Sequence, residues 1–364
     1  MTDRIWHTDW QRRRLSRRSF LAGGVALVAA PSVPLIGQPR QTPRFAGPPF
    51  SLGVASGDPT SDSVMLWTRL APVPLEGGGM GDEAVEVNWA VATDERMTRV
   101  VQRGTSVARP DLGHAVHVEV TGLEPDRWYW YRFRSGGEAS RVGRTRTFPV
   151  AGSPVRQLKM AFVSCQHYET GYFTAYRHML EDDLDVVFHL GDYIYEYEGR
   201  DGRARKHTGD EIELLSDYRN RHALYKLDPD LQAAHARFPF IVTWDDHEVD
   251  NNYNPETMNK AHLQAAKDAF FETTSAERGP KDRLWRSYMW GSTAEIFVLD
   301  SRSERIPSTA KSDKPIYIGL EQMAWLKAGL KSSKAHFKVL LNLFYIRDCK
   351  LRVCACGKTS LRME

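Results

Sequence analysis

Hydrophobic and polar residues alternate along the first part of the chain in short segments that turn residues separate. Between residues 50 and 149 the alternation has a period of two, and turns recur roughly every ten residues. Because successive side chains of a strand point to opposite faces, this pattern predicts strands buried on one face. The clearest segments are SVMLWTRL, AVEVNWAVAT, HAVHVEV and RWYWYRF. We therefore expect an N-terminal β-sandwich domain.

At about residue 155 the pattern changes to continuous apolar segments that alternate with amphipathic ones. The apolar runs predict strands buried on both faces, namely LKMAFVSC, LDVVFHLGD, FPFIVTWDD, TAEIFVLDSR and HFKVLLNL. The intervening segments predict helices, among them DPDLQAAHARF with Asp228 as its N-cap and Pro229 in its first turn. Strands that alternate with helices predict an α/β sheet with helices on its faces over residues 155–342.

The last strand of the first domain carries a further signature. In TGLEPDRWYWYRF a turn precedes a Tyr-x-Tyr strand, which resembles the tyrosine corner of fibronectin-like and immunoglobulin-like domains. The expected fold class is therefore α/β, with a β-sandwich of this kind at residues 50–149 followed by the layered α/β domain.

The N-terminal residues are predicted to direct export. The stretch SRRSFL is similar to the twin-arginine transport consensus, and a weakly apolar segment of about 15 residues follows it. This segment is too short to span a bilayer. We expect residues 1–36 to be a twin-arginine signal, read by the twin-arginine export machinery, and 37–49 to be a linker. The predicted location is periplasmic or extracellular; an uncleaved signal that anchors the chain stays an alternative, because a proline follows the alanines at the expected cleavage site.

Composition and charge exclude two classes of protein. The chain has 364 residues, with 49 basic and 46 acidic side chains and a formal net charge of +3. It has no basic stripe that interleaves with aromatic residues, so nucleic-acid binding is not expected. Cys165 is the only cysteine before Cys349, which argues against a disulfide framework.

Polar side chains gather where four of the predicted strands end. The clusters are SCQH, GDYIY, WDDHE and DSR, which begin at Ser164, Gly191, Trp244 and Asp300. Ligands bind at the carboxyl ends of the strands in such sheets, where these clusters are expected to meet. Carboxylates bind hard cations, a thiolate binds softer ones and histidine binds either, so the set predicts a pair of metal ions. Taken singly, Cys165 could be a small apolar core residue and each Asp a helix cap; four such strand ends together favour the metal site.

These motifs resemble those of a known family. GDYIY at 191–195 is similar to the GDxxY motif of purple acid phosphatases, and DHE at 246–248 lies where that superfamily has Asn-His-Asp/Glu. Longer stretches look like the PhoD-type alkaline phosphatases over about residues 49–342; they are PFSLGVASGDPTSDSVMLWTRLAP, FVSCQHYETGYF, FHLGDYIYEY and TWDDHEVDNNY. The resemblance implies a metallophosphoesterase that hydrolyses phosphate monoesters and diesters with ferric iron (Fe3+) and calcium (Ca2+).

The resemblance also implies which residues bind the metals. Cys165, Asp192 and Tyr195 would be iron ligands, and Asp192 would also bridge to calcium. Asp246 would hold the second metal, although the family's superfamily has Asn at this position. A hydroxide held by the metals would then attack phosphorus in line.

Two residues are candidates for direct contact with the phosphate. The resemblance implies that His247 donates to the phosphate or to the leaving oxygen. Arg302 is a candidate phosphate clamp because it follows a strand end and its guanidinium matches a phosphate in geometry. The division of roles among Asp245, Asp246 and Asn252 stays open.

The last residues depart from the family pattern. Family members continue with a strand that ends in a Gly-Asp-x-His motif, which this sequence lacks. Residues 343–364 contain three cysteines and no pattern of a strand leading into a helix. We expect an aberrant tail, as from a frameshift or a truncated gene, and a partial metallophosphoesterase domain with an unpaired sheet edge. Weakened metal affinity and little phosphatase activity would follow.

Two other functions stay open from the sequence alone. One keeps the site but acts on phosphodiesters, as a phospholipase-D-like phosphodiesterase. The other is an inactive, degenerate binding protein that keeps the fold as a scaffold. Comparing monoester with diester rates separates the first from a phosphatase, and a lack of bound iron would favour the second.

Overall fold

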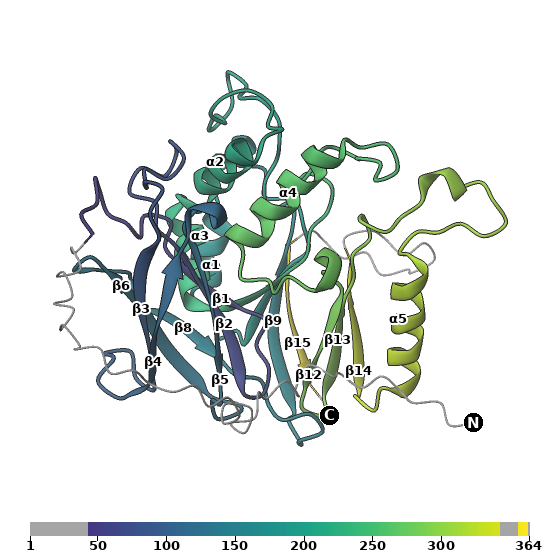
Figure 1. Ribbon diagram of the computed structural model, residues 1–364. Helices are drawn as coiled ribbons and strands as arrows, with labels where there is room; N and C mark the ends of the chain where they lie inside the picture. The colour runs from purple at the N-terminus through teal and green to yellow at the C-terminus, as the bar shows by residue number, and fades with distance from the viewer. Residues whose placement is uncertain (1–42, 343–355, 363–364) are drawn as a thin grey trace, which may run out of the picture. The chain divides into compact units, whose positions relative to one another are not determined.

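A seven-stranded sheet lies at the centre of the part of the chain that the computed structural model describes, residues 43–342 and 356–362 (Figure 1). Its strand order is β15-β9-β10-β11-β1-β2-β5. The strands are β1 (Val54–Gly57), β2 (Ser63–Arg69), β5 (Ala115–Thr121), β9 (Gln157–Val163), β10 (Val186–His189), β11 (Pro239–Val242) and β15 (Cys356–Arg362). β9, β10, β11 and β1 run parallel to one another, whereas β2, β5 and β15 pair antiparallel with their neighbours. Three predicted apolar segments thus form β9, β10 and β11.

A second sheet packs against the part of the central sheet that β1, β2 and β5 form. Its strands are β3 (Val85–Ala92), β4 (Val100–Ala108), β6 (Trp128–Ser135), β7 (Glu138–Ala139) and β8 (Gly143–Arg146). The two sheets share a buried core that includes Val64, Leu66, Tyr131 and Phe133. The strands of residues 50–149 therefore divide between two sheets, one of which continues into the second half of the chain. Local alternation did not predict this continuity, because it depends on the parallel pairing of β1 with β11.

A third sheet covers one face of the central sheet. It contains β12 (Arg286–Trp290), β13 (Ala294–Val298) and β14 (Phe337–Leu341). Trp290 and Ile296 from this sheet pack against Phe188 and Ile241 from β10 and β11. The segments TAEIFVLDSR and HFKVLLNL do contain strands, as predicted, but in a separate sheet. Our expectation of helices on both faces of one sheet was wrong for this face.

Helices cover the opposite face of the central sheet. The α-helices are α1 (Thr174–Met179), α2 (Leu215–Lys226), α3 (Pro229–Arg237), α4 (Lys260–Thr273) and α5 (Leu320–Ser332). Short 3-10 helices are η1 (Pro110–Leu112), η2 (Tyr168–Thr170), η3 (Pro280–Asp282) and η4 (Pro307–Thr309). Leu231 of α3 and Phe270 of α4 belong to the same buried core as Val187 and Phe240. α5 lies against the third sheet instead, where Leu326 contacts Phe297 (Figure 1).

Two helices show what the sequence pattern could and could not predict. The N-cap of α3 is confirmed, because the Asp228 side chain accepts hydrogen bonds from two backbone N–H groups of the first turn. α2 was not predicted. Its buried residues include Arg221, His222 and Lys226, so no apolar face marks this helix in the sequence.

The ends of the chain are described only in part. The expected signal at residues 1–36 lies outside the described residues, as do the first residues of the linker and residues 343–355. No helix within the described residues is long and apolar enough to cross a membrane. Residues 356–362 form β15, which pairs antiparallel with β9. β15 is therefore the edge strand next to β9 in the central sheet.

Lys226 is expected to make stability depend on pH. Burial lowers the pKa of its ammonium group from 10.5 to about 7, and Nζ lies 3.2 Å from Tyr193 Oη. The unfolded chain therefore binds a proton between pH 7 and 10.5 that the folded chain does not, which costs stability as pH falls through this range. Lys226→Met should raise the thermal unfolding midpoint by roughly 5 °C at pH 6–7. The gain should shrink as pH rises towards 10.5.

The control for this measurement is Lys334→Met, because Lys334 is exposed. It should leave the unfolding midpoint nearly unchanged at every pH. A difference between Lys226→Met and the parent chain that is constant from pH 6 to 10.5 would contradict the account.

Candidate metal centre

The loops that follow β9, β10 and β11 bring the candidate ligands together at one edge of the central sheet. These strands are parallel, so their carboxyl ends lie at the same edge. Backbone hydrogen bonds join the first two loops: Cys165 N–H donates to Gly191 O and Gln166 N–H donates to Asp192 O, each at 3.1 Å. Main-chain pairing therefore sets the separation of Cys165 and Asp192, independently of any bound ion.

Gly191 allows the second and third loops to approach closely. Its φ is +117°, in the region that favours glycine, and a Cβ here would lie 2.5 Å from Asp245 N. Cys165, Asp192 and Asn252 also have positive φ, between +53° and +55°. Left-handed backbone at residues with a side chain costs about 1–3 kcal/mol each and clusters at functional sites. The positive φ angles in these loops are therefore consistent with a functional site at the ends of β9 to β11.

Two acidic side chains donate hydrogen bonds to one oxygen of Asp192. Cys165 Sγ and Tyr195 Oη each lie 3.2 Å from Asp192 Oδ2. Cys165 is exposed to solvent, but partial desolvation and the Asp192 charge still raise the pKa of its thiol to about 12, and the same two causes raise the pKa of Tyr195 far above its usual value. Burial also raises the pKa of Asp192 itself. A thiol, a phenol and a carboxylate thus lie close together. A metal ion bound between them would replace their protons.

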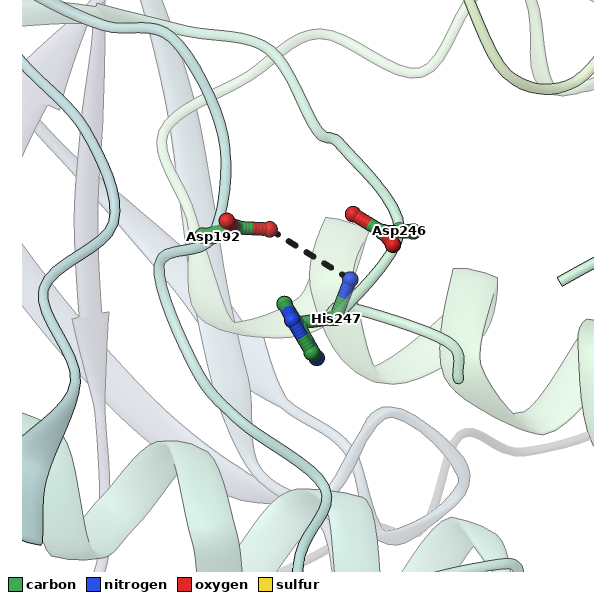
Figure 2. A group of neighbouring side chains, drawn as sticks. All are labelled: Asp192, Asp246 and His247. Atoms are coloured by element: carbon green, nitrogen blue, oxygen red, sulfur yellow. Dashed lines mark hydrogen bonds between the residues drawn. The ribbon is translucent and has the colours of Figure 1, made fainter. Parts of the chain in front are cut away.

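Asp192, Asp246 and His247 form a second convergence (Figure 2). One ligand atom from each residue lies within 4.8 Å of the others. The His247 N–H points at Asp192 Oδ1 with a separation of 3.4 Å. Asp192 therefore faces Cys165 and Tyr195 through one carboxylate oxygen and the loop after β11 through the other.

Arg302 connects the loop after β13 to the two neighbouring aspartates. Its Nε donates to Asp245 Oδ1, and its Nη2 donates to Asp246 Oδ1 at 3.0 Å. Burial outweighs this pairing at Asp245 and raises its pKa to about 7. At Asp246 burial also acts to raise the pKa, but the Asn252 N–H at 2.6 Å and the Arg302 charge outweigh it, and the pKa is lowered. Asp246 is thus the more readily ionised of the pair.

Asn252 reaches Asp246 through its backbone. Its side-chain Nδ2 donates instead to Asn251 Oδ1 at 2.9 Å. The predicted candidates Asp245, Asp246 and Asn252 therefore lie together, but they differ in what they present. Only Asp246 belongs to the group of potential ligand atoms that includes Asp192 and His247.

His247 is oriented by a carboxylate that the sequence did not single out. Nδ1 lies 2.8 Å from Glu196 Oε2, and Glu196 is almost fully buried. Burial alone would lower the pKa of His247, but the bond to Glu196 and the charges of Glu196, Asp192 and Asp246 outweigh it and raise the pKa to about 9. The ring centroids of His247 and Tyr195 are 4.1 Å apart. The raised pKa favours the imidazolium form, and the bond to Glu196 holds the ring in one orientation.

Glu248 is the other residue to which sequence reasoning gave no role, although it lies in the WDDHE cluster. It is fully buried and accepts hydrogen bonds from the backbone N–H groups of Tyr193 and Asp245. Burial raises its pKa to about 8. The only sequence signal for Glu196 and Glu248 is an acidic residue inside each motif, which by itself does not distinguish a buried acceptor from a solvated side chain.

The side chains present fit metal ions. Asp192, Asp246 and Glu248 are acidic groups within or beside the same buried site, and Arg302 pairs with Asp245 and Asp246 rather than with Asp192. Buried carboxylates are normally paired with cations or bound to metals. Carboxylate, thiolate and phenolate groups all bind metal ions once they are deprotonated.

Each half of the chain matches a known protein family. A family model described as PhoD-like phosphatase matches residues 160–358, and one described as PhoD-like phosphatase, N-terminal domain, matches residues 37–149. The first match extends past residue 342, where we expected the family resemblance to end.

Individual relatives agree with the family models. The chain is 46% identical to alkaline phosphatase D of Bacillus subtilis (strain 168) over 91% of its own length and 63% of that protein. A solved structure of PhoD matches with a TM-score of 0.78 and 47% identity, over 82% of this chain and 63% of that one. A purple acid phosphatase from yellow lupin (Lupinus luteus) seeds gives a TM-score of 0.48 at 14% identity, over 79% of this chain and 50% of that one. The chain thus spans about 63% of the first two relatives.

Cys165 is expected to report on the charge of Asp192. In the metal-free protein the raised thiol pKa should make alkylation by iodoacetamide slow at pH 8, because the thiolate is the nucleophile. Asp192→Asn removes the negative charge, so the thiol pKa should fall and the rate should rise by up to about tenfold per pKa unit. Mass spectrometry of the peptide that contains Cys165 measures the rate.

Asp230→Asn is the matched control, because Asp230 pairs with Arg177 on the surface. It should leave the alkylation rate of Cys165 unchanged. If Asp192→Asn alkylates at the parent rate, the proposed contact between the thiol and the carboxylate is wrong.

Proposed function

The chain belongs to the PhoD-like phosphatase family, and from that premise we propose that it is an exported, metal-dependent phosphatase acting on phosphate monoesters and also on diesters. One observation carries the proposal: Cys165 Sγ and Tyr195 Oη converge on Asp192 Oδ2, beside Asp246 and His247. Export rests on the twin-arginine motif at the N-terminus.

The proposed ligand sets follow from the chemistry of the side chains. Cys165, Asp192 and Tyr195 would hold ferric iron, and Asp192 and Asp246 would share calcium. When bound, such ions polarise a phosphoryl oxygen and lower the pKa of water. The burial that raises the pKa of all three iron ligands supports this assignment, since a cation would offset the cost of ionising them.

His247 is proposed to donate a proton to the leaving oxygen or a hydrogen bond to the phosphate. Glu196 holds Nδ1, so Nε2 is the ring nitrogen that would serve the substrate. Phosphoryl transfer depends mainly on positioning and on neutralising charge. A cationic imidazole that a buried carboxylate orients supplies both.

Arg302 is proposed to contribute its positive charge to phosphate binding. Its fork contacts Asp245 and Asp246, which fixes the guanidinium next to a candidate metal ligand. The role proposed here is therefore electrostatic, with Asp245 as the residue that holds Arg302 in place.

The proposed metal dependence has a direct test. Chelation of the purified chain should abolish hydrolysis of p-nitrophenyl phosphate, and iron with calcium should restore it. Asp192→Asn should lower kcat/KM by about a hundredfold or more, because it removes the shared ligand. Asp230→Asn should leave kcat/KM unchanged. Full activity in protein that elemental analysis shows to be metal-free would overturn the proposal, and bis-p-nitrophenyl phosphate as substrate tests the diester part.

The pH dependence of the same reaction should depend on Glu196. Since the bond to Glu196 raises the pKa of His247, the imidazole should keep its proton to higher pH than a free histidine, so kcat should fall on the alkaline side as this proton is lost. Glu196→Gln removes the largest cause that raises this pKa, and the fall in kcat should move to lower pH. The exposed Glu181→Gln is the control. An unchanged alkaline limb in Glu196→Gln would show that His247 is not the proton donor.

A further inference from the structure

We propose that Glu248 is a positioning residue that sets the spacing between the two loops that carry the candidate metal ligands. It would act through its two carboxyl oxygens, each of which accepts one backbone hydrogen bond. The inference rests on the proposed function, because the ligands concerned are those of the proposed metal centre.

Glu248 joins two loops that are distant in sequence. Its Oε1 accepts from the Tyr193 N–H at 2.7 Å, and its Oε2 accepts from the Asp245 N–H at 2.8 Å. Tyr193 directly follows Asp192, and Asp245 directly precedes Asp246. The fully buried Glu248 side chain therefore accepts a hydrogen bond from the main chain next to Asp192 and from the main chain next to Asp246. These are the two carboxylates that would share the calcium ion.

The local fold explains how one side chain reaches both loops. Val249 N–H and Asp250 N–H donate to Asp246 O at 2.8 and 2.9 Å, which makes a tight turn after β11. Glu248 folds back across this turn to the N–H three residues earlier, as the acidic residue of a capping box does. Its second oxygen then points to the loop after β10.

Glutamine cannot replace Glu248 in this arrangement. An amide has one accepting oxygen, and its NH2 group would face a backbone N–H, which leaves a buried donor without an acceptor. Glu169 provides the contrast. It is as deeply buried, but both its partners, the N–H groups of Arg200 and His207, donate to the single oxygen Oε1 at 2.8 and 3.0 Å. A glutamine at that position would keep both bonds, so Glu169→Gln is a matched control.

The two proposed ions should respond differently when Glu248 is changed. Cys165, Asp192 and Tyr195 belong to loops that their own backbone bonds hold together, so the iron site does not depend on Glu248. The calcium site is shared by Asp192 and Asp246, which lie on the two loops that Glu248 joins. Loss of the correct spacing should therefore weaken calcium binding and spare iron binding. A general loss of stability would weaken both.

The experiment compares Glu248→Gln, Glu248→Asp and Glu169→Gln with the parent chain. Elemental analysis gives the iron content, and calorimetric titration of the iron-loaded, calcium-free protein with calcium chloride gives the calcium dissociation constant. Changes in residues that support metal ligands typically cost about 10–100-fold in affinity. We expect a loss of this size for calcium in both Glu248 variants, with iron content retained, and values within about twofold of the parent for Glu169→Gln.

Each other outcome has a defined meaning. Calcium binding by Glu248→Gln at the parent affinity overturns the proposal, and so does an equal loss of iron and calcium. If Glu248→Gln does not fold by circular dichroism, the comparison uses Glu248→Asp; if neither folds while Glu169→Gln does, Glu248 serves stability and the proposal is wrong. A parent chain that binds no metal overturns the proposed function itself, which separates the two failures.

Discussion

The parallel pairing of β9, β10 and β11 is the constraint on which the candidate metal centre depends. It brings three loops to one edge of the sheet, and main-chain bonds from Cys165 and Gln166 to the next loop fix their separation before any ligand is involved. Gly191 is required at this junction because a side chain there would collide with Asp245. The backbone thus sets where the candidate ligands lie, and their side chains determine which ions they can bind.

As a consequence of this arrangement, the side chains of Asp192 and of the two acids that donate to it have no Lys or Arg partner within the described residues. Arg302 pairs with Asp245 and Asp246, and His247 pairs with Glu196, whereas Asp192 receives hydrogen bonds from two further acids. Ionising those acids in a buried site is unfavourable unless a cation replaces their protons. A cluster of acids that cannot ionise easily would lower the stability of a protein without metal. Binding of a metal ion offsets this cost.

The sequence predicted what is local and missed what is not. Continuous apolar runs identified the strands that carry the site, and their polar ends identified Cys165, Asp192, Tyr195 and Asp246 as neighbours. Strand pairing between distant segments left no local signal, so neither the separate sheet of β12, β13 and β14 nor the continuation of the central sheet into β1 was predicted. The sequence did not predict α2 because the buried face of this helix includes polar residues. Glu196 and Glu248 were missed because an acceptor for backbone N–H groups is recognisable only when its partners are in place.

Anomalous diffraction at the iron edge from crystals of the protein loaded with iron and calcium tests the central claim most directly. We expect an iron peak at bonding distance from Cys165 Sγ, Asp192 Oδ2 and Tyr195 Oη. A peak bound elsewhere, or none in protein with iron confirmed in solution, would contradict it.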